Sequence, residues 1–271
     1  MTSNLLSIGK SGLLAAQVGL STTGHNITNA NVDGYNRQVV LQQTSQSNFA
    51  GYGFVGTGTE VSQIKRQYDS FMATQVNAAQ SATSALDSYY TQISQIDNML
   101  ADPTAGLSPA MADFFKGVQD FSSNPSSVAS RQALLSSANS LTARFQGLSA
   151  RLTEIGDGVN SQITSNVKVI NSYAKQIADL NTSITNLTVN ESNQPNDLLD
   201  QRDQLITELN KYVKATVQPA ANNTVTISIG AGQPLVVADR SFQLAATPSR
   251  TDPNRIEVGY VTGSTVTVLP D

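Results

Sequence analysis

The chain has 271 residues, of which 39% are hydrophobic and 13% are charged, and its formal net charge is -4. The acidic balance argues against nucleic-acid binding, because nucleic-acid-binding domains usually carry a basic stripe. The sequence has no cysteine and a single histidine, His25. It therefore excludes thiol catalysis, disulfides and nearly all zinc-type sites. The length suits one large domain or two to three small ones.

Residues 1–27 predict an amphipathic helix of coiled-coil type. Small and apolar residues recur in alternating steps of three and four, which is typical of a seam that packs on another helix. We take Leu6, Leu13, Leu20 and Ile27 as its packing residues. Two interpretations stay open. The helix packs on its own domain, or its seam pairs with a helix outside this chain or on a neighbouring subunit.

Membrane insertion is not expected. No apolar run reaches the roughly 18 residues that a spanning helix needs. The segment Gly12–Leu20 has the texture of a short signal-peptide core, but Gln17 interrupts it and Lys10 is the only basic residue before it. A cleavable signal is therefore disfavoured, and another export route is expected if the protein leaves the cell.

The helix leads into an Asn-rich segment, residues 25–38, with the sequence HNITNANVDGYNRQ. Asp33-Gly34 is a strong turn former. An extended stretch follows from Arg37 to Gln63. Within it, residues 51–56 match the G-x-G-x-x-G dinucleotide fingerprint. However, no helical pattern begins at Gly53 and no βαβ unit surrounds it, so the pattern indicates turns in an extended loop.

Four helical patterns are expected after this stretch. The first begins at Val61. The second follows Ser108-Pro109, read as an N-cap and a first-turn proline. The third covers about 60 residues, Ser127 to Leu187, and would span roughly 90 Å. It belongs either to a rod-like bundle or to two helices bent at Gly156 and Gly158. The fourth begins at Pro195.

Alternating β-type patterns begin near residue 216. The predicted fold class is therefore α+β and multi-domain. An N-terminal coiled-coil-type helix with a turn (residues 1–36) precedes an extended loop and an elongated helical bundle (37–215), and a mainly β domain starts at 216–271. The sequence stops just after a strand pattern, so we expect a truncated domain.

No constellation in the sequence indicates catalysis, a metal site or a cofactor site. Asp197, Asp200 and Asp203 recur at i, i+3 and i+6. They could seed a cation site, but carboxylates near a helix N-terminus are favoured by the helix dipole, and Arg202 can pair locally. His25 has no Asp or Ser partner at a motif spacing, so a capping or interface role is favoured over a role as a base. An enzyme is therefore not expected.

The Asn-rich segment resembles the N-terminal signature of bacterial flagellar axial proteins, which comprise rod, hook and hook-associated subunits. We assign its signature turn to Asn29, Asn31, Asp33, Gly34, Tyr35 and Arg37. Further segments are similar to the hook-associated proteins of the hook–filament junction: Gly56–Val61, Arg66–Asp69, Ser94–Asp97, Gly106–Pro109, Asn124-Pro125, Arg131–Leu135 and Gln194–Asp203. The resemblance covers the N-terminal half of such a protein. One departure is Val32-Asp33, where the family commonly has Thr-Pro.

The resemblance implies a non-enzymatic structural subunit of the extracellular flagellum, exported by the flagellar type III apparatus and placed between hook and filament. It implies self-association in a ring, with hook protein below and a second junction protein on the filament side. It also implies an export chaperone for the missing C-terminal part. In this family the N- and C-terminal helices pair in an inner tube.

Three alternatives remain at this stage. A flagellin-like filament subunit, or another rod or hook subunit, shares the terminal seam and the polar texture. A cytoplasmic signalling coiled coil shares the long helices but needs neither the turn nor the β segment. An enzyme that uses the β segment as a substrate site would require acidic pairs in the missing half.

Overall fold

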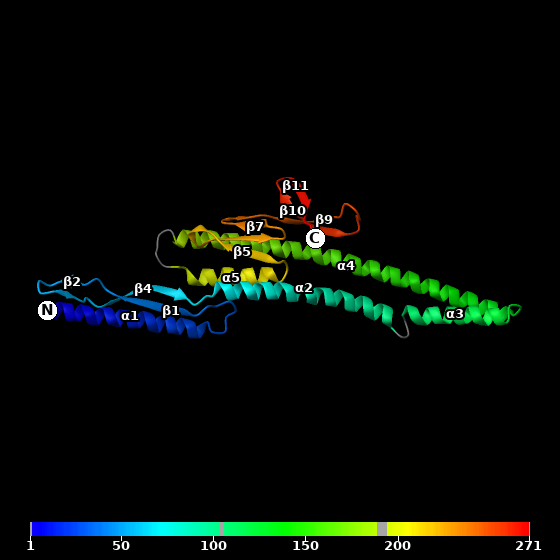
Figure 1. Cartoon of the computed structure of the whole chain (residues 1–271), viewed down its shortest axis with the longest axis horizontal. Helices are drawn as coiled ribbons and strands as arrows, with labels where there is room; N and C mark the ends of the chain where they lie inside the picture. Colours follow the sequence, from blue (N-terminus) through cyan, green and yellow to red (C-terminus); the bar gives the residue numbers. More distant parts are fainter. Residues whose placement is uncertain (1, 103–105, 189–193, 271) are drawn as a thin grey trace. The chain divides into compact units, whose positions relative to one another are not determined.

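A computed structural model describes residues 2–102, 106–188 and 194–270; residues 1, 103–105, 189–193 and 271 lie outside the described part. It confirms the mixed α+β class, with an N-terminal helix, long helices and small antiparallel sheets toward the C-terminus (Figure 1). The contacts divide the chain into two compact units. The first comprises Met1–Ser81, Val169–Leu244 and Pro270–Asp271, and the second Ala82–Lys168 and Ala245–Leu269.

The first unit begins with helix α1 (Thr2–Thr28), beside which β1 (Gln38–Thr44) and β4 (Thr59–Arg66) form an antiparallel pair (Figure 1). Gln38 lies opposite Arg66, so the two ends of the hairpin meet at its base. The short strands β2 (Asn48–Phe49) and β3 (Phe54–Val55) pair at its far end. In the loop between β2 and β3, Gly51 has a φ of 84° and Gly53 a φ of 148°, and such positive values favour glycine. The interpretation of the Gly-rich motif as turns is confirmed.

The expected helix start at Val61 is wrong. Val61 lies in β4, and helix α2 (Ser70–Ala101) begins nine residues later. The Asp69 side chain sets this start, because its Oδ1 accepts hydrogen bonds from the amides of Phe71 and Met72 at 2.9 and 3.1 Å. A carboxylate at this position satisfies amides that have no partner inside the helix.

The core of the first unit lies between the end of helix α4 (Val128–Thr188), helix α5 (Asn196–Asn210) and a four-stranded antiparallel sheet of order β5-β6-β7-β8. The strands are Ala215–Pro219, Val225–Ile229, Gln233–Val237 and Arg240–Ser241. In β6 the buried positions alternate, as expected for a strand with one face on a core. Each fully buried aliphatic side chain contributes about 1.5–3 kcal/mol. The fully buried ones are Ile177, Ile184, Leu209, Ile227, Ile229, Leu235 and Val236.

Helix α4 is a single helix of 61 residues, which decides between the two alternatives for this segment. Gly156 and Gly158 lie within it without ending it. Helix α4 begins in the second unit and ends in the first, whereas α2 begins in the first unit and ends in the second.

The second unit also holds helix α3 (Leu107–Ser123) and strands β9 (Leu244–Pro248, from Ala245), β10 (Ile256–Thr262) and β11 (Thr265–Val268), in the sheet order β11-β10-β9. Ser108 is not the N-cap of α3: Gly106 is, and Pro109 lies in the first turn, where its missing amide costs little. Asn160 on α4 holds the β9–β10 loop, since its amide donates to Asn254 O at 2.6 Å and accepts from Ile256 N at 2.9 Å.

The strands after residue 215 confirm the predicted change to β structure, but they are shared between the two units. Whether the segments 1–36, 37–215 and 216–271 behave as separate domains remains a prediction. Within the described part of the chain, no helix is apolar over a sufficient length to cross a membrane.

Candidate functional site

The signature turn, residues 29–37, is closed by the side chain of Asn26 on α1. Asn26 Nδ2 donates to Gln38 O at 2.8 Å, and its Oδ1 accepts from Gln38 N at 2.8 Å. The same oxygen accepts from Tyr35 Oη at 2.7 Å. One amide therefore ties the end of α1 to the start of β1 and fixes the loop between them.

Two aromatic rings meet where α1 leads into this turn. His25 and Tyr35 meet edge to face with their centroids 5.5 Å apart. Burial raises the pKa of Tyr35, and the carboxylates of Asp197 and Asp200 raise it further. Tyr35 is thus kept as a neutral hydrogen-bond donor to Asn26. Asn29 caps the helix end, donating from Nδ2 to His25 O at 2.9 Å.

The turn is anchored to helix α5 through Asp200. Asn36 donates to this carboxylate twice, from its backbone amide at 2.9 Å and from Nδ2 at 2.8 Å. Arg66, at the end of β4, donates from Nη1 to Asp200 Oδ1 at 2.8 Å and to Asp203 Oδ2 at 2.6 Å. The Arg66 guanidinium also lies 4.2 Å from the ring centroid of Tyr68. Asp200 therefore binds the residue that precedes the β1–β4 hairpin, Asn36, and the residue that ends it, Arg66.

Two further polar contacts flank Asp200. Gln38 Nε2 donates to Asp197 Oδ1 at 2.8 Å, and Asn196 Nδ2 donates to Ile64 O at 2.8 Å. The carboxylate series 197, 200, 203 is thus explained as the anchor of the turn and hairpin. Among the described residues no group of three or more His, Cys, Asp or Glu could hold a metal ion.

A second buried network links α5 to the sheet. Arg202 Nη1 donates to Asn181 Oδ1 on α4 at 3.1 Å and to Asn223 O at 2.5 Å. Asn181 Nδ2 in turn donates to Val225 O and Ala238 O at 3.0 and 2.7 Å. The sequence suggested that Arg202 pairs locally, and its Nε lies 4.0 Å from Asp203 Oδ1. Neighbouring side chains of α5 therefore hold the signature turn and the sheet.

Burial disfavours the ionised form of Asp203, the second carboxylate that Arg66 contacts. Burial raises the pKa of Asp203 above 3.8, and the nearby Arg66 charge and hydrogen bond offset this only in part. A raised folded-state pKa means that the stability from the protonated carboxyl is present below about pH 3.8 and is lost as pH rises through the folded pKa. The ionised carboxylate is thus a cost to the fold at neutral pH.

We therefore expect the change Asp203→Asn to become more favourable, relative to the wild-type chain, as pH rises from 3 to 7. The gain should be about 1.4 kcal/mol for each unit by which the pKa is raised. Urea unfolding at several pH values measures it. The exposed Asp179, 64% accessible and paired with Lys175, provides the control, because its carboxylate stays in contact with solvent. A variant that instead loses stability toward neutral pH would contradict this account.

The predicted seam of α1 lies on its exposed face. Leu6, Leu13, Leu20 and Ile27 are 77%, 74%, 75% and 71% exposed. The opposite face is covered: Ala15 and Thr22 are buried, and Ser11 Oγ accepts a hydrogen bond from Thr59 N at 3.2 Å. The helix packs on the β1–β4 hairpin through its small residues, which leaves the leucine row without cover in the first unit.

The remaining predicted turn residues differ in their surroundings. Asn31, Asp33, Gly34 and Arg37 are all exposed, and Gly34, with φ of 79°, also lies close to α5. A Cβ on Gly34 would meet Gln204 Oε1 at 2.7 Å and Gln204 Cβ at 2.8 Å. The sequence interpretation missed Asn26, Asn36, Gln38 and Arg66. Only the aspartate series on α5 signalled a partner for them.

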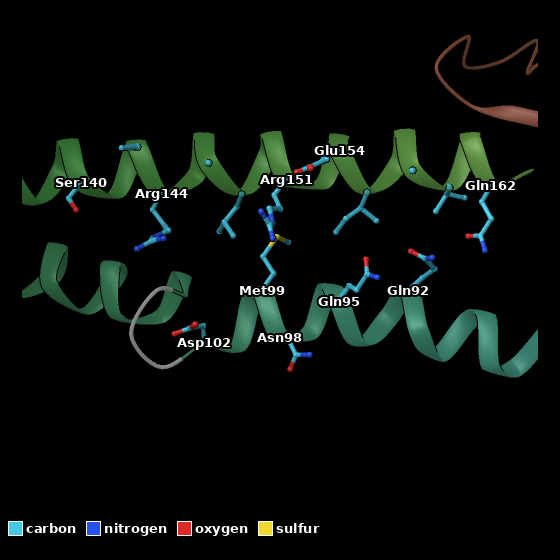
Figure 2. A pocket seen from close by; sticks show the side chains of 16 residues that line it. Gln92, Gln95, Asn98, Met99, Asp102, Ser140, Arg144, Arg151, Glu154 and Gln162 are labelled. Carbon is cyan, nitrogen blue, oxygen red and sulfur yellow. The ribbon is translucent and has the colours of Figure 1, made fainter.

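The second unit contains a groove of about 1180 Å³ between α2 and α4 (Figure 2). Gln92, Gln95 and Met99 reach into it from α2, and Arg144 and Arg151 from α4, as Figure 2 shows. Three apolar residues of α4 also line it: Leu148, Ile155 and Val159. The apolar side chains of α4 therefore face an open groove here and not a closed core.

Residues 93–271 match the sequence profile described as "Flagellar hook-associated protein FlgK helical domain". The chain belongs to the flagellar hook-associated protein FlgK family. It is 42% identical to flagellar hook-associated protein 1 of Salmonella typhimurium (strain LT2) over 260 residues, covering 96% of the chain and 47% of that relative. Identity to the Escherichia coli (strain K12) relative is also 42%, over 97% of the chain and 48% of the relative.

A solved structure supports the FlgK assignment. The flagellar hook junction protein FlgK from Burkholderia pseudomallei is 35% identical, with a TM-score of 0.66 over 73% of this chain and 36% of that one. The chain spans about half the length of the curated relatives that it matches. The predicted resemblance to hook-associated proteins is thus confirmed.

Proposed function

We propose that this chain is the N-terminal part of a structural subunit that joins hook and filament in the extracellular bacterial flagellum, and that it is not an enzyme. The observation that carries the proposal is the 42% identity to hook-associated protein 1 across nearly the whole chain. The inventory of the described residues agrees with a packing role, since polar side chains there make anchors between elements.

In this proposal α1 supplies the contact with neighbours. Its exposed leucine row buries apolar surface only when a partner helix covers it, and a short isolated helix gains most of its stability from such packing. The partners follow from the resemblance: other copies in a ring, hook protein on one side and a second junction protein on the other. An export chaperone would act on the part of the protein beyond this chain.

The signature turn gives α1 a fixed direction. Asn26 closes the turn, and Asp200 holds it on α5, so the exposed seam is registered against the rest of the first unit. A subunit that must contact two different neighbours needs a fixed α1 position. If α1 were displaced, its leucine row would no longer lie opposite the partner helix that covers it.

The substitution Gly34→Val in the full-length protein is expected to abolish filament attachment. A β-branched residue at positive φ costs about 1–3 kcal/mol, and its Cβ would also meet Gln204. The turn should leave α5 while the core around Ile177 and Leu209 stays folded. In a strain lacking the native gene, we expect hooks without filaments and filament protein in the medium. Electron microscopy and immunoblotting measure both.

Gly51→Val is the matched control. Gly51 has a similar φ of 84°, but a Cβ there meets nothing within 4 Å. It should therefore carry the same backbone strain and retain filaments. Normal swimming with Gly34→Val would overturn the role given to the turn. Failure to export the variant would move the role of the turn to secretion. Filaments that persist when the whole protein is absent would exclude a junction function.

A further inference from the structure

We infer that Asp33-Gly34 is a site of spontaneous isoaspartate formation, and that this reaction detaches the signature turn from α5. The dipeptide occurs twice in the chain, at Asp33-Gly34 and at Asp157-Gly158. The first pair lies in an exposed turn and the second inside helix α4. The same Asp-Gly pair can therefore be compared in a turn and in a helix of one chain.

The turn leaves both reacting groups free. The Asp33 side chain is exposed, and among the described residues neither its carboxylate nor the Gly34 amide makes a hydrogen bond within the turn or to α5. Both residues line an open pocket of about 620 Å³, so the side chain has room to rotate toward the amide. Glycine at position 34 presents no Cβ that would hinder approach to its nitrogen.

The reaction needs only water. The Gly34 nitrogen attacks Cγ of Asp33, and an N–Cγ bond forms. The Cγ–O bond breaks, and the hydroxyl of the protonated carboxyl leaves with the amide proton as water. Water then opens the five-membered imide. Attack at Cγ restores aspartate, whereas attack at the former backbone carbonyl leaves the chain running through Cβ and Cγ. No electrons are transferred, and one water is lost and regained.

The product has one additional backbone carbon next to the anchor of the turn. Asn36, two residues after Gly34, donates two hydrogen bonds to Asp200, and both require the backbone at its present register. The inserted carbon shifts that register by a distance larger than the tolerance of a hydrogen bond. Isomerisation of Asp33 should therefore release the turn, whereas the same event elsewhere would not.

The two sites should react at different rates. Every amide inside an α-helix is bonded to the carbonyl four residues earlier, so imide formation at Asp157 requires local opening of α4. We expect isoaspartate at Asp33 to accumulate at least about tenfold faster than at Asp157, a difference equivalent to about 1.4 kcal/mol. Asn36→Ala, which removes one of the two bonds to Asp200, should increase the rate at Asp33 further.

The test incubates the full 271-residue chain at neutral pH and follows both sites by peptide mass spectrometry that distinguishes isoaspartate. Asp33→Glu is the control, since a six-membered imide forms far more slowly. After incubation, hydrogen exchange at Asn36 and Gln38 should rise in the wild-type chain and stay unchanged with Asp33→Glu. Equal rates at Asp33 and Asp157, or isoaspartate at Asp33 without faster exchange at Asn36, would overturn the inference. The test does not depend on the proposed function.

Discussion

Replacing Asp200 by Ala is expected to lower the free energy of unfolding by about 3–5 kcal/mol, the usual cost of leaving one member of a buried ion pair without its partner. Arg66 is only 9% exposed and Asp200 only 6%. Asp203 would then be the remaining carboxylate partner of Arg66. Burial raises the pKa of Asp203 and so already disfavours its ionised form. Urea unfolding measures the loss, and hydrogen exchange at Asn36 and Gln38 measures release of the turn.

The control for Asp200 is again Asp179. Its ion pair with Lys175 at 2.8 Å lies in solvent, so Asp179→Ala should change stability by less than about 1 kcal/mol. If Asp200→Ala and Asp179→Ala lost equal stability, the Asp200 contacts would contribute no more than an exposed ion pair, and Asp200 would not be the anchor of the turn. If Asp200→Ala were destabilised without faster exchange at Asn36, the anchor would hold only the hairpin.

The second large effect is expected on assembly and not on stability. Changing Leu6, Leu13, Leu20 and Ile27 together to Ser should leave the isolated chain as stable as before, because all four are more than 70% exposed. Covered by a partner helix, each would contribute about 1.5–3 kcal/mol, so their joint loss should prevent incorporation. Cells carrying the variant should swim no better than cells without the protein.

A single change away from this row serves as the control. Leu14 is 52% exposed but lies outside the heptad positions. Leu14→Ser should therefore preserve motility. A quadruple variant that still assembles filaments would show that the seam is not the contact surface. A quadruple variant that unfolds would instead favour the alternative in which α1 packs on its own domain.

Long periodic segments could be predicted well from sequence because one rule governs them. The helical pattern of α4 was recognised over its whole length, although Gly156 and Gly158 left a bend open, and the alternation of β6 marks a half-buried strand. The start of α2 was misplaced because a local event decided it. The Asp69 side chain, which caps the amides of Phe71 and Met72, determines the boundary more strongly than the apolar pattern near Val61.

The sequence predicted the signature turn but not the residues of α5 and β4 that hold it. The signature residues around Gly34 were recognised from the sequence, but their anchor on α5 lies more than 160 residues away along the chain. The sequence placed Asp197, Asp200 and Asp203 on one helix and gave no sign of which donors they meet. That pairing depends on how the β1–β4 hairpin brings Arg66 back beside Gln38, which is a property of tertiary structure.

The most direct test of the central claim asks whether the α1 seam is covered in the assembled flagellum. Leu13→Cys introduces a thiol on the exposed row of a chain that has no other cysteine among its 271 residues. We expect a maleimide reagent to label it rapidly in the secreted monomer and to be excluded in purified hook–filament structures. Thr44→Cys, an exposed position in β1, reports whether the reagent reaches the assembled protein. Labelling of Leu13→Cys at the same rate in monomer and assembly would contradict the account.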